Sequence, residues 1–106
     1  MMTNYEIEID NQAIAANLKR LTNQVYKLLP SREEGSDWEK PLFTIIEEFI
    51  GMDRVLIGQH EILFPLLCKL EGLFVLTQEN DFFLFRRTIF ECLSLINELS
   101  EKCQTI

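Results

Sequence analysis

The sequence predicts an all-α fold, a small bundle of three or four helices. Apolar residues recur at alternating steps of three and four in two segments, one near each end of the chain. Between these segments, apolar residues recur every seven positions over most of residues 42–73. Such spacings place apolar side chains on one face of a helix, whereas only one short stretch alternates as a strand does.

The chain is predicted to form one helical domain over residues 1–106. Its length is typical of a single domain, and a hydrophobic content of 47% is sufficient for a core of its own. Charged residues make up 25% of the chain, which is typical of a globular protein and not of a disordered one.

Residues 1–10 are predicted to be an extended arm ahead of the first helix. Tyr5, Ile7 and Ile9 alternate with acidic residues, which is the period-two pattern of a strand. A helix of about 18 residues follows, because its apolar residues form a narrow seam. The seam consists of Ile14, Leu18, Leu21, Val25 and Leu28. Pro30 is expected to end this helix, since proline disrupts helix interiors.

Residues 30–40 are predicted to form a polar loop that contacts a protein partner. Arg32, Glu33 and Trp38 are the candidate contact residues, because arginine and tryptophan often anchor interfaces. The alternative is that Trp38 folds back over the helix that it precedes. That helix is expected to start near Trp38, or with Pro41 in its first turn.

Residues 42–73 are predicted to form one long helix, kinked or broken once near Gly58 or Pro65. The spacing by seven supports a continuous helix, in the row Leu42, Phe49, Leu56, Leu63 and Leu70. Inside a helix, however, glycine costs about 1 kcal/mol and proline about 3 kcal/mol. The alternative is therefore a helix over 38–50, a turn, and a second helix over 53–71.

The last helix is predicted to begin near Asn80 or Asp81 and to mediate a homodimer. Its seam consists of Phe82, Phe85, Ile89, Cys92, Ile96, Leu99 and Cys103, and further apolar residues widen it. The eight phenylalanines of the chain are more than a small monomeric bundle readily hides. We therefore expect a two-fold dimer through this helix, with Arg86 and Arg87 as candidate contacts to a partner or to nearby acids.

No catalytic residue, cofactor site or metal site is predicted. His60 is the only histidine, and no serine or cysteine is spaced to form a nucleophile pair with it. The three cysteines lack the spacing of a zinc site, and one histidine cannot supply a repeated Glu-x-x-His motif. The sequence therefore indicates a protein that is not an enzyme. The alternative is a carboxylate–metal hydrolase that uses Glu47, Glu48 and His60.

The net charge of −7 argues against direct binding of nucleic acid, which needs a basic surface. The polar start of the chain and the lack of a long apolar run predict a cytoplasmic protein without a membrane span. We expect a self-associating interaction protein whose partners are a second copy and an unknown protein. The alternative is an acidic inhibitor or nucleic-acid mimic, of the kind that a mobile element can encode, in a basic groove of a nucleic-acid-handling protein.

Overall fold

A computed structural model describes residues 4–54, 56 and 58–104, and it confirms the all-α prediction. The four α-helices are α1 (Asn4–Glu33), α2 (Glu39–Gly51), α3 (His60–Gly72) and α4 (Phe82–Gln104). Short 3₁₀ turns lie between them: η1 (Met52–Arg54), η2 (Leu73–Val75) and η3 (Glu79–Asp81). Among the described helices, none combines the length and the apolar run that crossing a bilayer requires.

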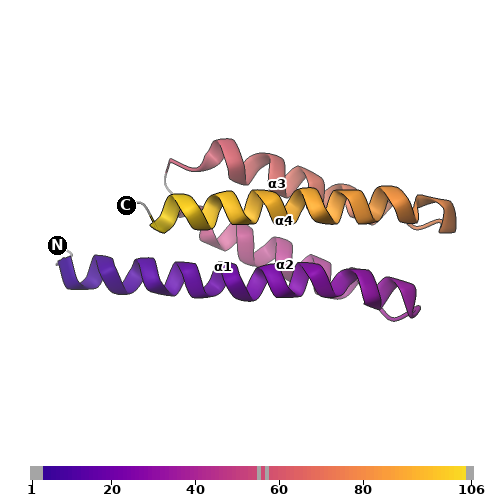
Figure 1. The fold of residues 1–106 in the computed structure, drawn as a ribbon, viewed down its shortest axis with the longest axis horizontal. Helices are drawn as coiled ribbons and strands as arrows, with labels where there is room; N and C mark the ends of the chain where they lie inside the picture. The colour runs from indigo at the N-terminus through magenta and orange to yellow at the C-terminus, as the bar shows by residue number, and fades with distance from the viewer. Residues whose placement is uncertain (1–3, 55, 57, 105–106) are drawn as a thin grey trace.

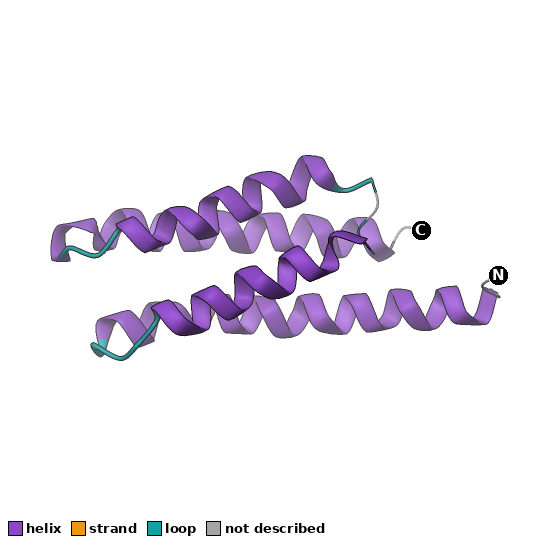
Figure 2. Cartoon of the chain, turned by 180° about the vertical axis from the view of Figure 1, so that it is seen from behind, coloured by secondary structure: helices purple, strands orange, loops and turns teal. Residues whose placement is uncertain are grey.

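The helices run alternately up and down in two layers of two. In Figure 1, α1 and α4 lie side by side in the layer nearer the viewer, and Figure 2 shows α2 and α3 from the other side. Each helix contacts the next one along the chain, and α1 also packs against α4. We call these pairs the α1/α4 layer and the α2/α3 layer. The molecule is 51 Å long, because α1 runs along most of its length.

Most of the two predicted seams lies in the core, although Phe82 is only partly buried and the side chain of Cys103 lies outside the described part of the chain. All five seam residues of the first helix are buried, and α4 buries a row of its own. This core row of α4 consists of Phe85, Ile89, Cys92, Ile96 and Leu99, each without exposed surface. Side chains from α2 and α3 complete the same cluster. The cluster lies between the two layers and therefore holds both of them together.

The extended arm predicted for residues 1–10 is wrong for residues 4–10, which are the first turns of α1. Residues 1–3 lie outside the described part of the chain. The alternating pattern contains no glycine or proline, so a helix that has already formed can extend through it at little cost. Pro30 likewise does not end α1. Its carbonyl still accepts the N–H of Glu34 at 2.9 Å, so that the helix runs on to Glu33.

The loop predicted over 30–40 is shorter in the structure, because its first four residues belong to α1 and its last two begin α2. Gly35 has a φ of 75°, a left-handed conformation that glycine adopts without steric cost at a helix end. The carboxylate of Asp37 accepts the backbone N–H groups of Glu39 and Lys40 at 3.1 and 3.3 Å. This contact satisfies two of the free donors at the start of α2.

The long helix predicted over 42–73 is broken near Gly58, one of the two expected positions, and it is not continuous, because the chain reverses between α2 and α3. The reversal follows η1, and Gly58 within it has a φ of 85°, which side chains with a Cβ atom rarely adopt. The alternative of two helices is closer to the structure, although α3 begins at His60 and not at residue 53. Pro65 lies inside α3 and does not interrupt it.

Because the core row is fully buried, shortening one of its side chains should lower the stability of the fold markedly. We expect Ile89→Ala to lower the free energy of unfolding by about 2–5 kcal/mol, since it removes a fully buried side chain and leaves a cavity. Phe64→Ala, on the exposed side of α3, is the control and should change stability by less than about 0.5 kcal/mol. Urea denaturation followed by circular dichroism measures both. Similar losses in the two variants would contradict this assignment of the core.

Candidate functional site

The five predicted contact residues lie at one end of the bundle but not on one surface. Arg32 and Glu33 are in the last turn of α1, and Trp38 immediately precedes α2. Arg86 and Arg87 are near the start of α4, at the same end. Glu33, Arg86 and Arg87 are exposed, Arg32 is half-buried and Trp38 is buried.

Trp38 packs into the core. Only 9% of its surface is exposed, and its ring meets Phe85 edge-on at 5.0 Å between centroids. Phe74 stacks beside it at 6.5 Å with an interplanar angle of 26°. The tryptophan therefore folds inward, as the alternative expected, but it packs on η2 and α4 and leaves little surface for a partner.

Arg32 ties the end of α1 to the segment between α3 and α4. Its Nη2 donates a hydrogen bond of 2.7 Å to the carbonyl oxygen of Gln78. Its guanidinium carbon lies 4.5 Å from the ring centroid of Phe85 and 5.6 Å from that of Phe82. The planar guanidinium thus combines a directed hydrogen bond with stacking, which the ammonium of lysine cannot do.

Exposed aromatic residues gather on the outer surface of the α1/α4 layer. Tyr26 on α1 is 54% exposed, and Phe83 and Phe90 on α4 are 81% and 43% exposed. The guanidinium carbon of Arg86 lies 5.6 Å from the ring centroid of Phe90. Tyr26, Arg86 and Phe90 border an open groove of about 360 Å³ between the two helices, which we call the aromatic groove. It is lined by Tyr26, Leu29, Pro30, Glu33, Phe82, Arg86 and Phe90.

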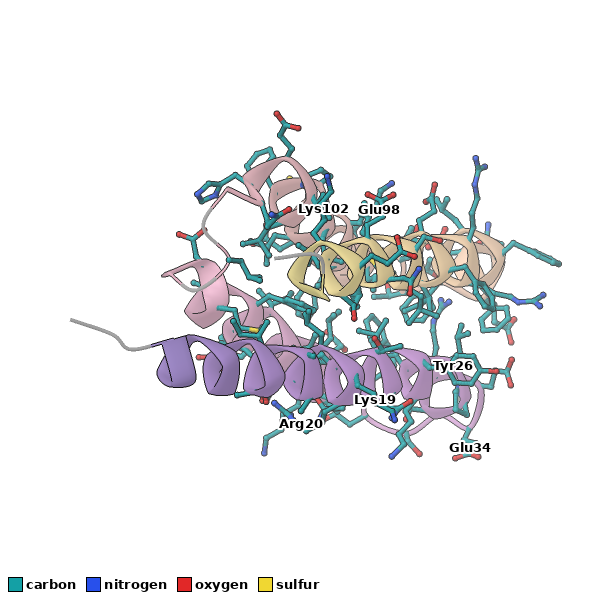
Figure 3. All side chains as sticks on the ribbon, turned by 60° about the vertical axis from the view of Figure 1, so that its left-hand side comes forward. Lys19, Arg20, Tyr26, Glu34, Glu98 and Lys102 are labelled. Carbon is teal, nitrogen blue, oxygen red and sulfur yellow. The ribbon has the colours of Figure 1, made fainter. Side chains whose placement is uncertain are left out.

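A second hollow continues along the same layer toward the chain ends. It has a volume of about 540 Å³, and small or polar residues of both helices line it. Its lining residues include Ala15, Ala16, Lys19, Asn23, Leu93, Asn97 and Ser100. Figure 3 shows Lys19 and Tyr26 in succession along α1, and Glu98 and Lys102 on the last turns of α4.

The sequence predictions missed Tyr26, Pro30 and the outward position of Phe83. A signal for α4 was present, because Phe83, Arg87 and Phe90 repeat at steps of four and three beside the core seam. For α1 the sequence held no comparable signal. Tyr26 directly follows a core residue, and its exposure depends on how closely α4 approaches.

Two of the residues considered for a metal site, Glu48 and His60, have separate partners. The Arg20 Nη2 atom lies 2.6 Å from Glu48 Oε2, and this hydrogen bond raises the pKa of Arg20. His60 Nδ1 lies 3.2 Å from Asp53 Oδ1. Within the described residues, no three histidine, cysteine or acidic side chains are grouped so that they could hold a metal ion.

The two cysteines whose side chains are described differ in environment. Cys68 is exposed on α3, whereas Cys92 is part of the core row of α4. Burial raises the pKa of the Cys92 thiol to about 12, because the core disfavours the charged thiolate. Since the thiolate is the nucleophile, Cys92 is chemically inert in the folded chain.

The contacts of Arg32 predict that lysine cannot replace it. We expect Arg32→Lys to lower the free energy of unfolding by about 1–3 kcal/mol, because the hydrogen bond to Gln78 and the stacking are lost together. Thermal and urea denaturation measure this loss. The matched control is Arg87→Lys, an exposed arginine near the same end of the bundle. A loss in the control as large as in the variant would contradict the proposed anchoring role.

The burial of Cys92 predicts two observations in a Cys103→Ser background. Cys68 should react with dithionitrobenzoate at once, whereas Cys92 should react only when the chain unfolds. The free energy of unfolding should also fall as the pH rises above about 9, because only the unfolded thiol then ionises. Replacing Cys92 with alanine should abolish that part of the pH dependence. Rapid labelling of two thiols in the folded chain would contradict the assignment.

Comparisons with protein-family models, curated proteins and solved structures find no match for this chain. Its function must therefore be argued from its own surface. On the outer side of the α1/α4 layer, exposed aromatic and arginine side chains border a groove, and this surface is therefore the candidate functional site.

Proposed function

We propose that this chain is a self-associating, non-catalytic interaction protein whose contact surface is the outer side of the α1/α4 layer. The observation that carries the proposal is the aromatic groove, where the exposed rings of Tyr26 and Phe90 lie beside Arg86, with Phe83 and Arg87 also exposed on α4. Aromatic and arginine side chains are enriched at interfaces and supply most hot spots.

The free energy gained by removing the exposed aromatic rings from water supports association. Burying a phenylalanine that would otherwise contact water gains about 1.5–3 kcal/mol. Phe90 on α4 and Tyr26 on α1 line the same groove, and the exposed Phe83 lies two helical turns before Phe90 on the same side of α4. Their burial against a second surface would therefore contribute several such gains at one site, as interface hot spots do.

The size of the layer also supports association. The 23 residues of α4 correspond to a length of about 35 Å at 1.5 Å per residue. Two packed helices are about 20 Å wide, so the layer offers on the order of 700 Å². A stable interface buries about 800 Å² on each partner. The area of the α1/α4 layer is close to this value, whereas α4 alone would provide about half of it.

The proposal predicts a dimer that depends on Phe90. Light scattering at micromolar concentration should give twice the 12.5 kDa mass of the chain. Phe90→Asp should weaken association by about 30-fold or more, because a charge replaces a buried ring. Phe43→Asp, an equally drastic change at an exposed site on α2, is the control and should leave the dimer intact. A 12.5 kDa wild-type species under these conditions would refute self-association.

A further inference from the structure

We infer that two copies pair with their α4 helices antiparallel, so that Arg87 of each copy lies against Glu101 of the other. This inference rests on the proposed self-association and adds its orientation and register. It concerns the residues of α4 that point away from the core row. That outer row consists of Phe83, Arg87, Phe90, Ser94, Glu98 and Glu101, all of them exposed.

The outer row has the spacing of a helix seam. Its members follow at steps of four, three, four, four and three, so they lie in one stripe along α4. At about 100° per residue, this stripe lies roughly opposite the core row. The row is therefore available to a second molecule over nearly the whole length of α4.

The charges along this row are separated. Arg87 lies toward the start of α4, whereas Glu98 and Glu101 lie toward its end. Two parallel copies would place arginine against arginine and glutamate against glutamate. Two antiparallel copies place Arg87 of each against Glu98 and Glu101 of the other, and the same contact occurs twice. Such a self-complementary pattern is what a two-fold interface requires.

The position of Ser94 determines the register. Arg87 and Glu101 are each seven residues from Ser94, in opposite directions. A two-fold axis that passes at Ser94 therefore aligns Arg87 with Glu101. Ser94 is also the smallest side chain of the row, so the two helices can approach closely at the axis. In this register Phe90 of each copy lies level with Glu98 of the other, because each is four residues from Ser94.

Helix α1 fits the same axis. Asn23 and Leu93 line one hollow, so an axis at Ser94 passes α1 near Asn23. Lys19 and Tyr26 lie four and three residues from Asn23, in opposite directions. The two-fold axis therefore brings the ammonium group of Lys19 in one copy close to the ring of Tyr26 in the other. This pairing is favourable as a cation–π contact.

The α2/α3 layer also exposes phenylalanines, but its charges disfavour self-pairing. Helices α2 and α3 expose one lysine, Lys40, and several glutamates. These exposed glutamates are Glu39, Glu47, Glu61 and Glu71. A two-fold contact would therefore place glutamates near glutamates. Like charges brought together across an interface oppose association, so a second copy pairs better with the α1/α4 layer.

The test of the inference exchanges the two charges between separate chains. We expect Arg87→Glu and Glu101→Arg each to weaken self-association by about tenfold, because each places like charges together. An equimolar mixture of the two variants should associate about as tightly as the wild type, since both contacts are then restored as opposite charges. Sedimentation equilibrium with one variant labelled measures the mixed species. Lys40→Glu, on α2, is the matched control and should leave association unchanged.

Cross-linking provides an independent test that needs no charge change. In a Cys68→Ser, Cys103→Ser background, Ser94→Cys should form a disulfide-linked dimer on mild oxidation, because residues at a two-fold axis face each other. Thr44→Cys on α2, exposed in the same way, should stay monomeric on a denaturing gel. Circular dichroism confirms that each variant folds.

The outcomes separate the two proposals. A monomeric wild-type chain would refute self-association itself, and with it the antiparallel pairing. A dimeric wild type in which the mixture stays weak and Ser94→Cys does not cross-link would refute only the pairing. Restoration in the mixture together with selective cross-linking at residue 94 would establish both.

Discussion

The burial of the core row of α4 is the constraint on which the rest of the structure depends. Phe85, Ile89 and Ile96 are fully buried, and α4 contacts both α1 and α3. Because the helices that pack against α4 lie on the side of its core row, the opposite stripe of α4 is left exposed. The outer row that we propose as an interface is therefore a consequence of the core and not a separate feature.

The same core explains why the predicted contact residues divide into two groups. Phe85 lies at one end of the core row, and both Arg32 and Trp38 pack against it. These two residues join α1, the start of α2 and the segment before α4, so they stabilise the loop end of the bundle. Arg86 and Arg87 follow Phe85 in sequence and point elsewhere. Whether an arginine anchors the bundle, as Arg32 does, or lies on its surface, as Arg86 and Arg87 do, therefore depends on the helix face that it occupies.

The helices of the bundle were predictable where apolar residues alternate at steps of three and four, as from Ile14 to Leu28. The errors lie where local signals compete with the rest of the chain. Proline and glycine act through a few backbone atoms, so their effect depends on position: Pro30 and Pro65 lie inside helices, whereas Gly58 takes a left-handed conformation in a reversal. Most of the candidate site could not be predicted, because the exposure of Tyr26 depends on the packing of α1 against α4, two segments distant in sequence.

The phenylalanines connect the sequence to the proposed assembly. Phe49 and Phe85 are buried, whereas four of the eight phenylalanines are exposed, two on each layer. Ring exposure therefore does not distinguish the layers, and charge must decide between them. The α1/α4 layer exposes both arginines and glutamates, which the proposed pairing would bring together, whereas exposed glutamates predominate on α2 and α3. Pairing through α1 and α4 would keep these glutamates on the far sides of the two copies, where water screens the repulsion that a net charge of −7 on each chain creates.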